Sequence, residues 1–207
     1  MAFAVFLVEA VIVSLSGVMA PGPINAATVG SGTRSPHAGA LVAFGHGIVE
    51  FPLMLFIFFG LGHVLGLEYV KTAIFLLGGG FLLFMGGDML RNLKHAEAGT
   101  SGSADAPLVA GILLSMGNAY FLVWWATVGA ALIVSASEFG AAGVAAFGFA
   151  HWLCDFAWLF LISWVVYKSR RLWTSKVNRV VFGLCSAILG GFGVWFIVSG
   201  ITLAVSA

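Results

Sequence analysis

The sequence predicts an all-α integral membrane protein. Of its 207 residues, 61% are hydrophobic and only 8% are charged, and the mean hydropathy is +1.08. A soluble domain keeps charged residues on its outside and cannot hide this much apolar surface. The apolar residues also run continuously instead of alternating, which favours membrane helices over membrane strands. The net charge is +1 and no block of basic residues occurs, so no nucleic-acid partner is expected.

Six apolar segments are each long enough for a membrane helix, which needs about 20 residues. They cover residues 3–20, 38–65, 72–90, 107–134, 141–167 and 180–203. A polar linker rich in glycine and serine, at 91–106, divides the chain into residues 1–90 and 107–207, each with three segments. We therefore expect one transmembrane domain over residues 1–207, built from two three-helix units.

A histidine and a carboxylate stand four residues apart in an apolar segment of each half. The pairs are His46 with Glu50 and His151 with Asp155. Positions i and i+4 lie on one face of a helix. Ionisable side chains are costly in hydrocarbon and normally face a bundle interior or a wet cavity. The two pairs therefore predict one composite site near the middle of the membrane.

Helix-breaking residues interrupt the first segment of each half. They are Pro21, Gly22 and Pro23 in the first half and Gly117 with Asn118 in the second. Proline removes a backbone donor and its ring clashes with the preceding turn, so a regular helix cannot continue. Within a membrane, such backbone is tolerated where protein or a water-filled cavity surrounds it. We expect broken helices 1 and 4 that serve in gating; a plain end to the first span at Pro21 is the alternative.

The halves repeat one plan: a broken segment, a segment with the His/carboxylate pair, and a segment with Gly-Gly-Phe at 79–81 or 190–192. Because three is an odd number of crossings, the second half enters the membrane from the opposite side. This 3+3 inverted-topology repeat is typical of secondary transporters, whose substrate sites lie near the membrane midplane.

Several chemistries suit the composite site. Carboxylates can hold the ammonium group of an amino acid or another small cationic solute, while helix N-termini after Pro23 and near Asn118 receive its carboxylate. Histidine titrates near neutral pH and can exchange protons for substrate. Two histidines and two carboxylates, with Asn25 or Asn118 as further ligands, also suit a divalent cation.

A membrane enzyme or redox carrier is a third reading that the sequence disfavours. No His-Glu-x-x-His motif occurs, and Cys154 and Cys185 do not occupy equivalent places in the two halves. We expect no enzymatic activity and no cofactor, apart from the divalent cation considered above. The expected partners are a small-molecule substrate and the lipid bilayer, and the sequence leaves a homo-oligomer open.

Pro21, Gly22 and Pro23 followed by Asn25, the glycine-rich second segment, the Gly-Gly-Phe third segment and the six-segment layout resemble the lysine exporter (LysE) family. The resemblance implies secondary-active, proton-coupled export of an amino acid or similar cationic solute across the cytoplasmic membrane. Two features depart from it: Asn118 is followed by alanine where the family has Asn-Pro, and the His/carboxylate pairs are not expected of an amino-acid exporter. These pairs support the alternative of a divalent metal cation exporter, since the wider superfamily includes manganese and cadmium exporters.

Lysine and arginine predict the orientation. Arg34, Arg91, Lys94 and the five basic residues between the fifth and sixth segments fall on one side of the membrane, and only Lys71 falls on the other. The side with more positive charge is cytoplasmic. Both termini then lie outside and the linker lies inside.

We expect alkaline phosphatase fused at Ala207 to be active and a fluorescent protein fused there to be dark. Phosphatase folds only outside the cytoplasmic membrane, whereas most fluorescent proteins mature inside. A fluorescent, phosphatase-silent carboxyl terminus would contradict the orientation.

Overall fold

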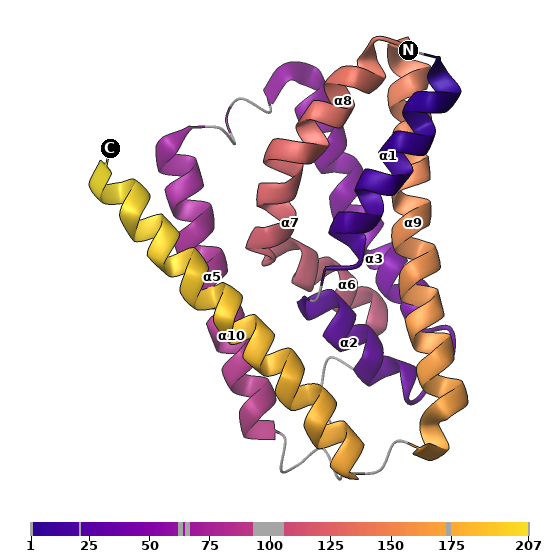
Figure 1. Ribbon diagram of the computed structural model, residues 1–207, viewed down its shortest axis with the longest axis vertical. Coiled ribbons are helices and arrows are strands. Elements are labelled where there is room, and N and C mark those ends of the chain that lie inside the picture. Colours follow the sequence, from indigo (N-terminus) through magenta and orange to yellow (C-terminus); the bar gives the residue numbers. More distant parts are fainter. Residues whose placement is uncertain are drawn as a thin grey trace.

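The computed structural model describes residues 2–20, 22–61, 64, 67–92, 106–172 and 175–206, and all regular secondary structure in these residues is helical. Figure 1 shows the arrangement. In chain order the elements are α1 (Phe3–Val18), α2 (Pro23–Gly32), α3 (Ala38–Phe56), the π-helical turn η1 (Ile57–Leu61), α5 (Glu68–Asn92), α6 (Pro107–Met116), α7 (Ala119–Trp124), the π-helical turn η4 (Trp125–Gly129), α8 (Ala130–Ser137), α9 (Gly140–Ser169), the 3-10 turn η5 (Arg170–Leu172) and α10 (Ser175–Ser206).

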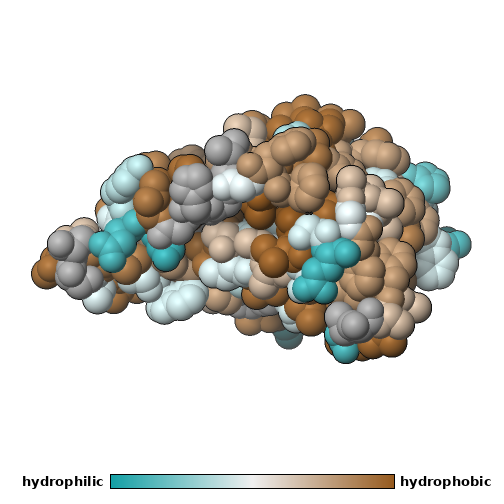
Figure 2. All heavy atoms as spheres, turned by 90° about the horizontal axis from the view of Figure 1, so that it is seen from above, coloured by the Kyte–Doolittle hydropathy of each residue, from teal (hydrophilic) through white to brown (hydrophobic). Residues whose placement is uncertain are grey.

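The predicted all-helical membrane class is confirmed. Among the described residues, three helical stretches are long and apolar enough to cross a membrane: Ala38–Gly60, Tyr120–Ser137 and Gly140–Leu172. The pair α1 and α2, bent by 77°, makes a fourth if it is one span. Large apolar side chains such as Ile12, Leu77 and Phe84 are 65–76% exposed, which suits contact with lipid. Viewed from the end that carries the N-terminus, most of the surface is hydrophobic (Figure 2).

Three helix boundaries differ from those expected. Helix α5 begins at Glu68, ahead of the segment expected from residue 72, so Glu68 and Lys71 lie in this helix. Helix α10 begins at Ser175 and takes in basic residues that were expected in a loop. Helix α3 continues past Pro52, and non-helical backbone lies at Gly60, with φ of 82°, inside the segment expected over 38–65. Glycine adopts positive φ without steric cost, so the chain departs from the helix there.

The helices end and restart at both expected interruptions. Helix α1 ends at Val18 and α2 starts at Pro23, whose fixed φ suits the first helical position. Helix α6 ends at Met116, and Asn118 caps α7 by accepting from the backbone N–H of Phe121 at 3.3 Å. Pro21 and most of the expected linker, residues 93–105, lie outside the described residues.

Helix α3 is at the centre, packed against α6 and α9, and α9 also contacts α1 and α2. Each helix that carries a His/carboxylate pair therefore packs against the first helix of the other half. Helices α5 and α10 run antiparallel and pack mainly on each other, with further contacts to α7 and α2 (Figure 1). The main apolar core surrounds Trp125, with Phe6 from α1 and Phe147 from α9.

The α5–α10 pair crosses at a glycine that the repeat did not identify. A Cβ atom at Gly79 would meet the carbonyl oxygen of Gly193 at 2.9 Å, and one at Gly193 would meet that of Gly79 at 3.0 Å. Gly190 and Gly191, which the repeat aligned with the glycines of α5, have no atom within 4 Å of such a Cβ. Small residues allow helices to approach closely in membranes, and only the packed structure shows which ones do so.

Both termini lie toward the upper end of the molecule in Figure 1. The end of α9, the start of α10 and the end of α5 lie toward the opposite end. These helix ends carry Arg91, Lys168 and Lys176, so the basic residues gather away from the termini. This arrangement is compatible with the orientation expected from charge.

Glycines also hold α3 and α6 together. A Cβ atom at Gly45 would collide with the backbone carbonyl of Leu108 and lie 3.1 Å from the Cα of Gly111. One at Gly111 would collide with the carbonyl of Val42 and lie 3.0 Å from the backbone nitrogen of His46. The two backbones touch directly beside the first histidine, so a side chain there has no room.

Gly111→Ala should lower the free energy of unfolding by about 1–3 kcal/mol, the usual cost of overpacking. Its matched control is Gly80→Ala, because a Cβ at Gly80 has no atom within 4 Å. That control should be neutral or stabilising by up to about 1 kcal/mol, since alanine favours helix. Chemical unfolding of both variants in detergent micelles measures the difference. Equal effects would show that α3 and α6 are not in backbone contact.

Candidate functional site

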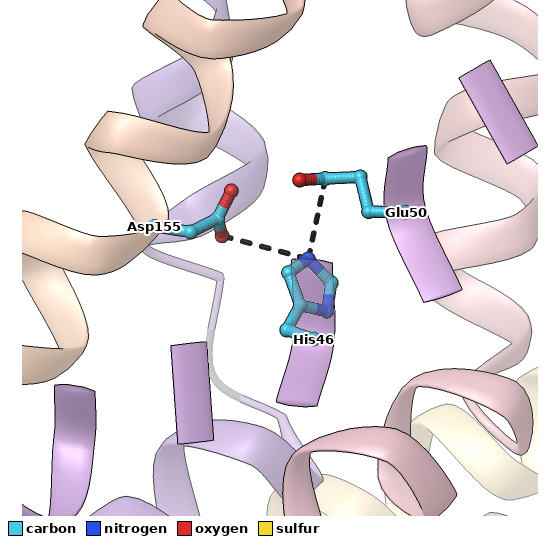
Figure 3. Close-up of side chains that lie close together, drawn as sticks. All are labelled: His46, Glu50 and Asp155. Carbon is cyan, nitrogen blue, oxygen red and sulfur yellow. Dashed lines mark hydrogen bonds and ion pairs between the residues drawn. The ribbon is translucent and has the colours of Figure 1, made fainter. Parts of the chain in front are cut away.

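The two His/carboxylate pairs meet in the interior of the molecule. Helix α3 supplies His46 and Glu50, and α9 supplies His151 and Asp155. All four are buried, and Glu50 is 0% exposed. We call these four residues the interior cluster. Figure 3 shows three of them, with the carboxylates of Glu50 and Asp155 directed toward the ring of His46.

Glu50 joins the two halves of the interior cluster. Its Oε1 lies 3.2 Å from Nε2 of His46 on the same helix and 3.1 Å from Nε2 of His151 on α9. Asp155 contacts the same two histidines. Its Oδ1 lies 3.8 Å from Nε2 of His46, and its Oδ2 lies 3.5 Å from Nε2 of His151. Both imidazoles therefore present the same nitrogen to both carboxylates.

Some oxygens of the interior cluster remain available to a ligand. Oε2 of Glu50 is buried and has no hydrogen-bond partner among the described residues, and Oδ2 of Asp155 has no hydrogen bond there beyond its 3.5 Å ion pair with His151. Burying a polar atom without a partner costs free energy. A cationic ligand that reached these oxygens would regain that free energy.

A serine supports each histidine from the other half. The Nδ1 of His46 lies 2.7 Å from Oγ of Ser115 on α6, and the Nδ1 of His151 lies 2.7 Å from Oγ of Ser14 on α1. Sequence reasoning did not identify either serine. A single serine in an apolar segment has no distinctive spacing, and only the packing of α1 on α9 and α6 on α3 brings them to the rings.

Aromatic side chains enclose the two rings. Trp124 stacks on His151 with ring centroids 5.0 Å apart, and Trp125 meets it edge-on at 5.0 Å. Phe121 meets His46 edge-on at 4.9 Å. These three residues follow Asn118 in the interrupted helix, so this interruption places an aromatic wall on the interior cluster. A cation near such rings gains from their negative faces.

One cavity connects the interior cluster with both interruptions. Its lining includes all four residues of the interior cluster together with Gly22, Pro23, Asn25 and Asn118. Gly117 lines a different cavity, where the ring of Phe81 would lie 2.5 Å from a Cβ at that position. Its expected role in gating stays a prediction.

The two expected asparagine ligands have structural partners. The amide of Asn25 donates to the carbonyl of Ala20 at 2.7 Å, across the first interruption, and its oxygen accepts from Nε1 of Trp158 at 3.1 Å. The oxygen of Asn118 accepts from the backbone N–H of Phe121. Both asparagines therefore stabilise the interruptions, and any role in binding stays a prediction.

Part of the interior cluster suits a metal ion. His46, Glu50 and Asp155 each offer one ligand atom, and these atoms lie within 4.8 Å of one another. Imidazole nitrogen with carboxylate oxygen is a common ligand set for first-row divalent metals. The same groups also suit an ammonium ion, so the geometry by itself leaves both cation classes in place.

The comparisons with known proteins agree with this picture. Residues 15–200 match the model of the LysE type translocator family. A curated relative, "Putative amino acid efflux protein YcgF" of Bacillus subtilis (strain 168), is 27% identical over 187 residues, which cover 87% of this chain and 89% of that protein. No solved structure matches. Because the family model spans most of the chain, this protein belongs to the LysE type translocator family.

Proposed function

We propose that this protein is a secondary-active exporter that moves an amino acid or a similar small cationic solute out across the cytoplasmic membrane. The observation that carries the proposal is the interior cluster, which lies in an apolar interior and lines a cavity shared with both helix interruptions. Family membership and a relative described as an amino acid efflux protein support the transport class. The carboxylates of Glu50 and Asp155 bind the cationic group of the substrate.

The N-terminus of α2 binds the carboxylate of the substrate. Gly22, Pro23 and Ile24 line the same cavity as the interior cluster. The first backbone N–H groups of a helix have no partner within the helix, and the helix dipole favours an anion there. An amino acid bound with its ammonium at Glu50 and its carboxylate at α2 would be held within this one cavity.

Proton coupling is the second part of the proposal. Histidine changes its charge near neutral pH, and both rings contact the carboxylates that would hold the substrate. A protonated ring and a cationic substrate would then compete for the same carboxylates, which is the requirement for exchange. Flattening of the pH dependence between about 5 and 8 in His46→Gln or His151→Gln would support this part.

The proposed architecture is six spans in a 3+3 inverted repeat with both termini outside. Helices α5 and α10, of 25 and 32 residues, have the length for the remaining two spans. The interruptions at Gly22 and Asn118 then lie at membrane depth, where irregular backbone is tolerated because it lines a cavity. Reciprocal packing of α3 on α6 and of α1 on α9 supports the repeat.

A divalent metal cation is the second candidate cargo, and one specific observation favours it. Three residues of the interior cluster bring ligand atoms within 4.8 Å of one another, including an imidazole nitrogen. An ammonium ion needs acceptors only, whereas borderline metals gain from nitrogen ligands. Both cargo classes use the same scaffold and the same orientation.

Glu50→Gln and Asp155→Asn should each reduce export about tenfold to a hundredfold. Each substitution keeps the shape and removes a charge, and a hydrogen bond to a charged group contributes about 1.5–3 kcal/mol. Initial rates of radiotracer uptake into inverted vesicles measure the effect. The matched control is Glu9→Gln, because Glu9 is an exposed carboxylate on α1. If the control lost as much activity as Glu50→Gln, the interior cluster would have no special role.

Cargo class is decided by a paired experiment on inverted vesicles. An amino-acid exporter should take up labelled amino acids and show no metal above background in elemental analysis of the purified protein. A metal exporter should take up a divalent cation, and Glu50→Gln should remove the bound metal. Uptake of neither cargo, by protein that is inserted and folded, would defeat the proposed function.

A further inference from the structure

We propose that Ser14 and Ser115 are positioning residues that hold the two histidines of the interior cluster in one tautomer, with the proton on Nδ1 and with Nε2 facing the carboxylates. The consequence for cargo binding rests on the proposed function. The tautomer itself rests only on the hydrogen bonds of the two serines.

Each serine hydroxyl bonds to a backbone carbonyl of its own helix. Oγ of Ser14 lies 2.6 Å from the carbonyl oxygen of Ala10, and Oγ of Ser115 lies 2.5 Å from that of Gly111. A carbonyl oxygen can only accept, and a hydroxyl has one proton to donate. Two oxygens this close repel each other unless that proton lies between them. Each serine hydroxyl therefore donates its proton to this carbonyl oxygen.

Each hydroxyl must then accept from the histidine. The Nδ1 of His151 lies 2.7 Å from Oγ of Ser14, and the Nδ1 of His46 lies 2.7 Å from Oγ of Ser115. With the hydroxyl proton already used, a hydrogen bond at this distance requires a proton on Nδ1. Both serines are 0% exposed, and the partner of a histidine nitrogen decides where its proton sits.

Only Nε2 of each histidine ring contacts the carboxylates of the interior cluster. Nε2 of each ring lies 3.1–3.2 Å from Oε1 of Glu50. When a ring is charged, Nε2–H donates to the carboxylate and the contact is a hydrogen bond, as for His46 and Glu50. Once that proton leaves, the neutral ring with Nδ1–H directs a lone pair at the carboxylate oxygen, and the two repel. A cation between them removes the repulsion. Without the serines, the ring would carry its proton on Nε2 and satisfy Glu50 with no cation present.

Each serine contacts a histidine that belongs to the other half of the chain. Ser14 belongs to the first half and serves His151 of the second, whereas Ser115 belongs to the second half and serves His46 of the first. The same carbonyl–serine–histidine chain is therefore built twice. This reciprocity gives a test in which each serine must affect one particular ring and leave the other unchanged.

The experiment uses the full chain with ¹⁵N-labelled histidine in lipid nanodiscs, at a pH where the rings are neutral. The ¹⁵N shifts of the ring nitrogens distinguish a protonated nitrogen from one with a lone pair. Loss of signals in His46→Gln and His151→Gln assigns the two rings. We expect Nδ1–H and unprotonated Nε2 for both rings in the wild type, and this measurement needs no serine variant. Finding the proton on Nε2 would overturn the proposal.

The serine variants supply the second arm. Ser14→Ala should move the proton toward Nε2 in His151 only, and Ser115→Ala should do so in His46 only. The matched control is Ser16→Ala: this exposed serine on α1 bonds the carbonyl of Val13 at 2.5 Å and should change neither ring. A serine variant that leaves its assigned ring unchanged would contradict the proposal.

Transport measurements distinguish a failure of this inference from a failure of the proposed function. If only a fraction of the molecules has the lone pair on Nε2, the apparent affinity equals the intrinsic affinity multiplied by that fraction. The KM for the cargo should then rise about twofold to tenfold in Ser14→Ala and Ser115→Ala, with a smaller change in kcat. Correct tautomers in a protein that transports neither cargo would refute the function alone. Transport by a protein with Nε2–H rings would refute the positioning role alone.

Discussion

Two histidines and two carboxylates in contact inside an apolar protein set the main constraint on this structure. An unpaired charge in hydrocarbon costs several kcal/mol, so none of the four can be buried by itself. Oε1 of Glu50 contacts both rings, and Asp155 lies within 3.8 Å of each. This shared contact holds α3 and α9 at one level. A change in the position of either helix would separate Glu50 from His151 and Asp155 from His46.

Packing around the interior cluster gives each half part of the other's site. Gly45 and Gly111 allow α6 to touch the backbone of α3, which brings Ser115 to His46. On the other side, α1 packs on α9 and brings Ser14 to His151. Neither half can complete its histidine environment without the other. Exchange of supporting residues is therefore a reason for the two halves to form one domain, beyond the apolar area that they bury together.

The helix interruptions contribute backbone and shape more than ligands. Asn25 closes the first interruption by hydrogen bonds to Ala20 and Trp158, and Asn118 caps the helix after the second. The chain that follows Asn118 then places aromatic rings against both histidines. These rings surround part of the interior cluster with apolar surface, which strengthens electrostatic interactions there. They line the same cavity as the interior cluster and the N-terminal residues of α2.

The helical membrane class, the positions of both interruptions and the residues of the interior cluster could all be predicted from the sequence. These follow from local chemistry: apolar composition, the backbone limits of proline, and the helical period that places His46 with Glu50 and His151 with Asp155 on one face. Tertiary structure decided that Glu50 bridges both rings, that serines support them, and that Gly193 and not Gly190 or Gly191 meets α5. The helical period identifies a face, whereas the depth and rotation at which two helices meet depend on contacts between side chains far apart in the chain.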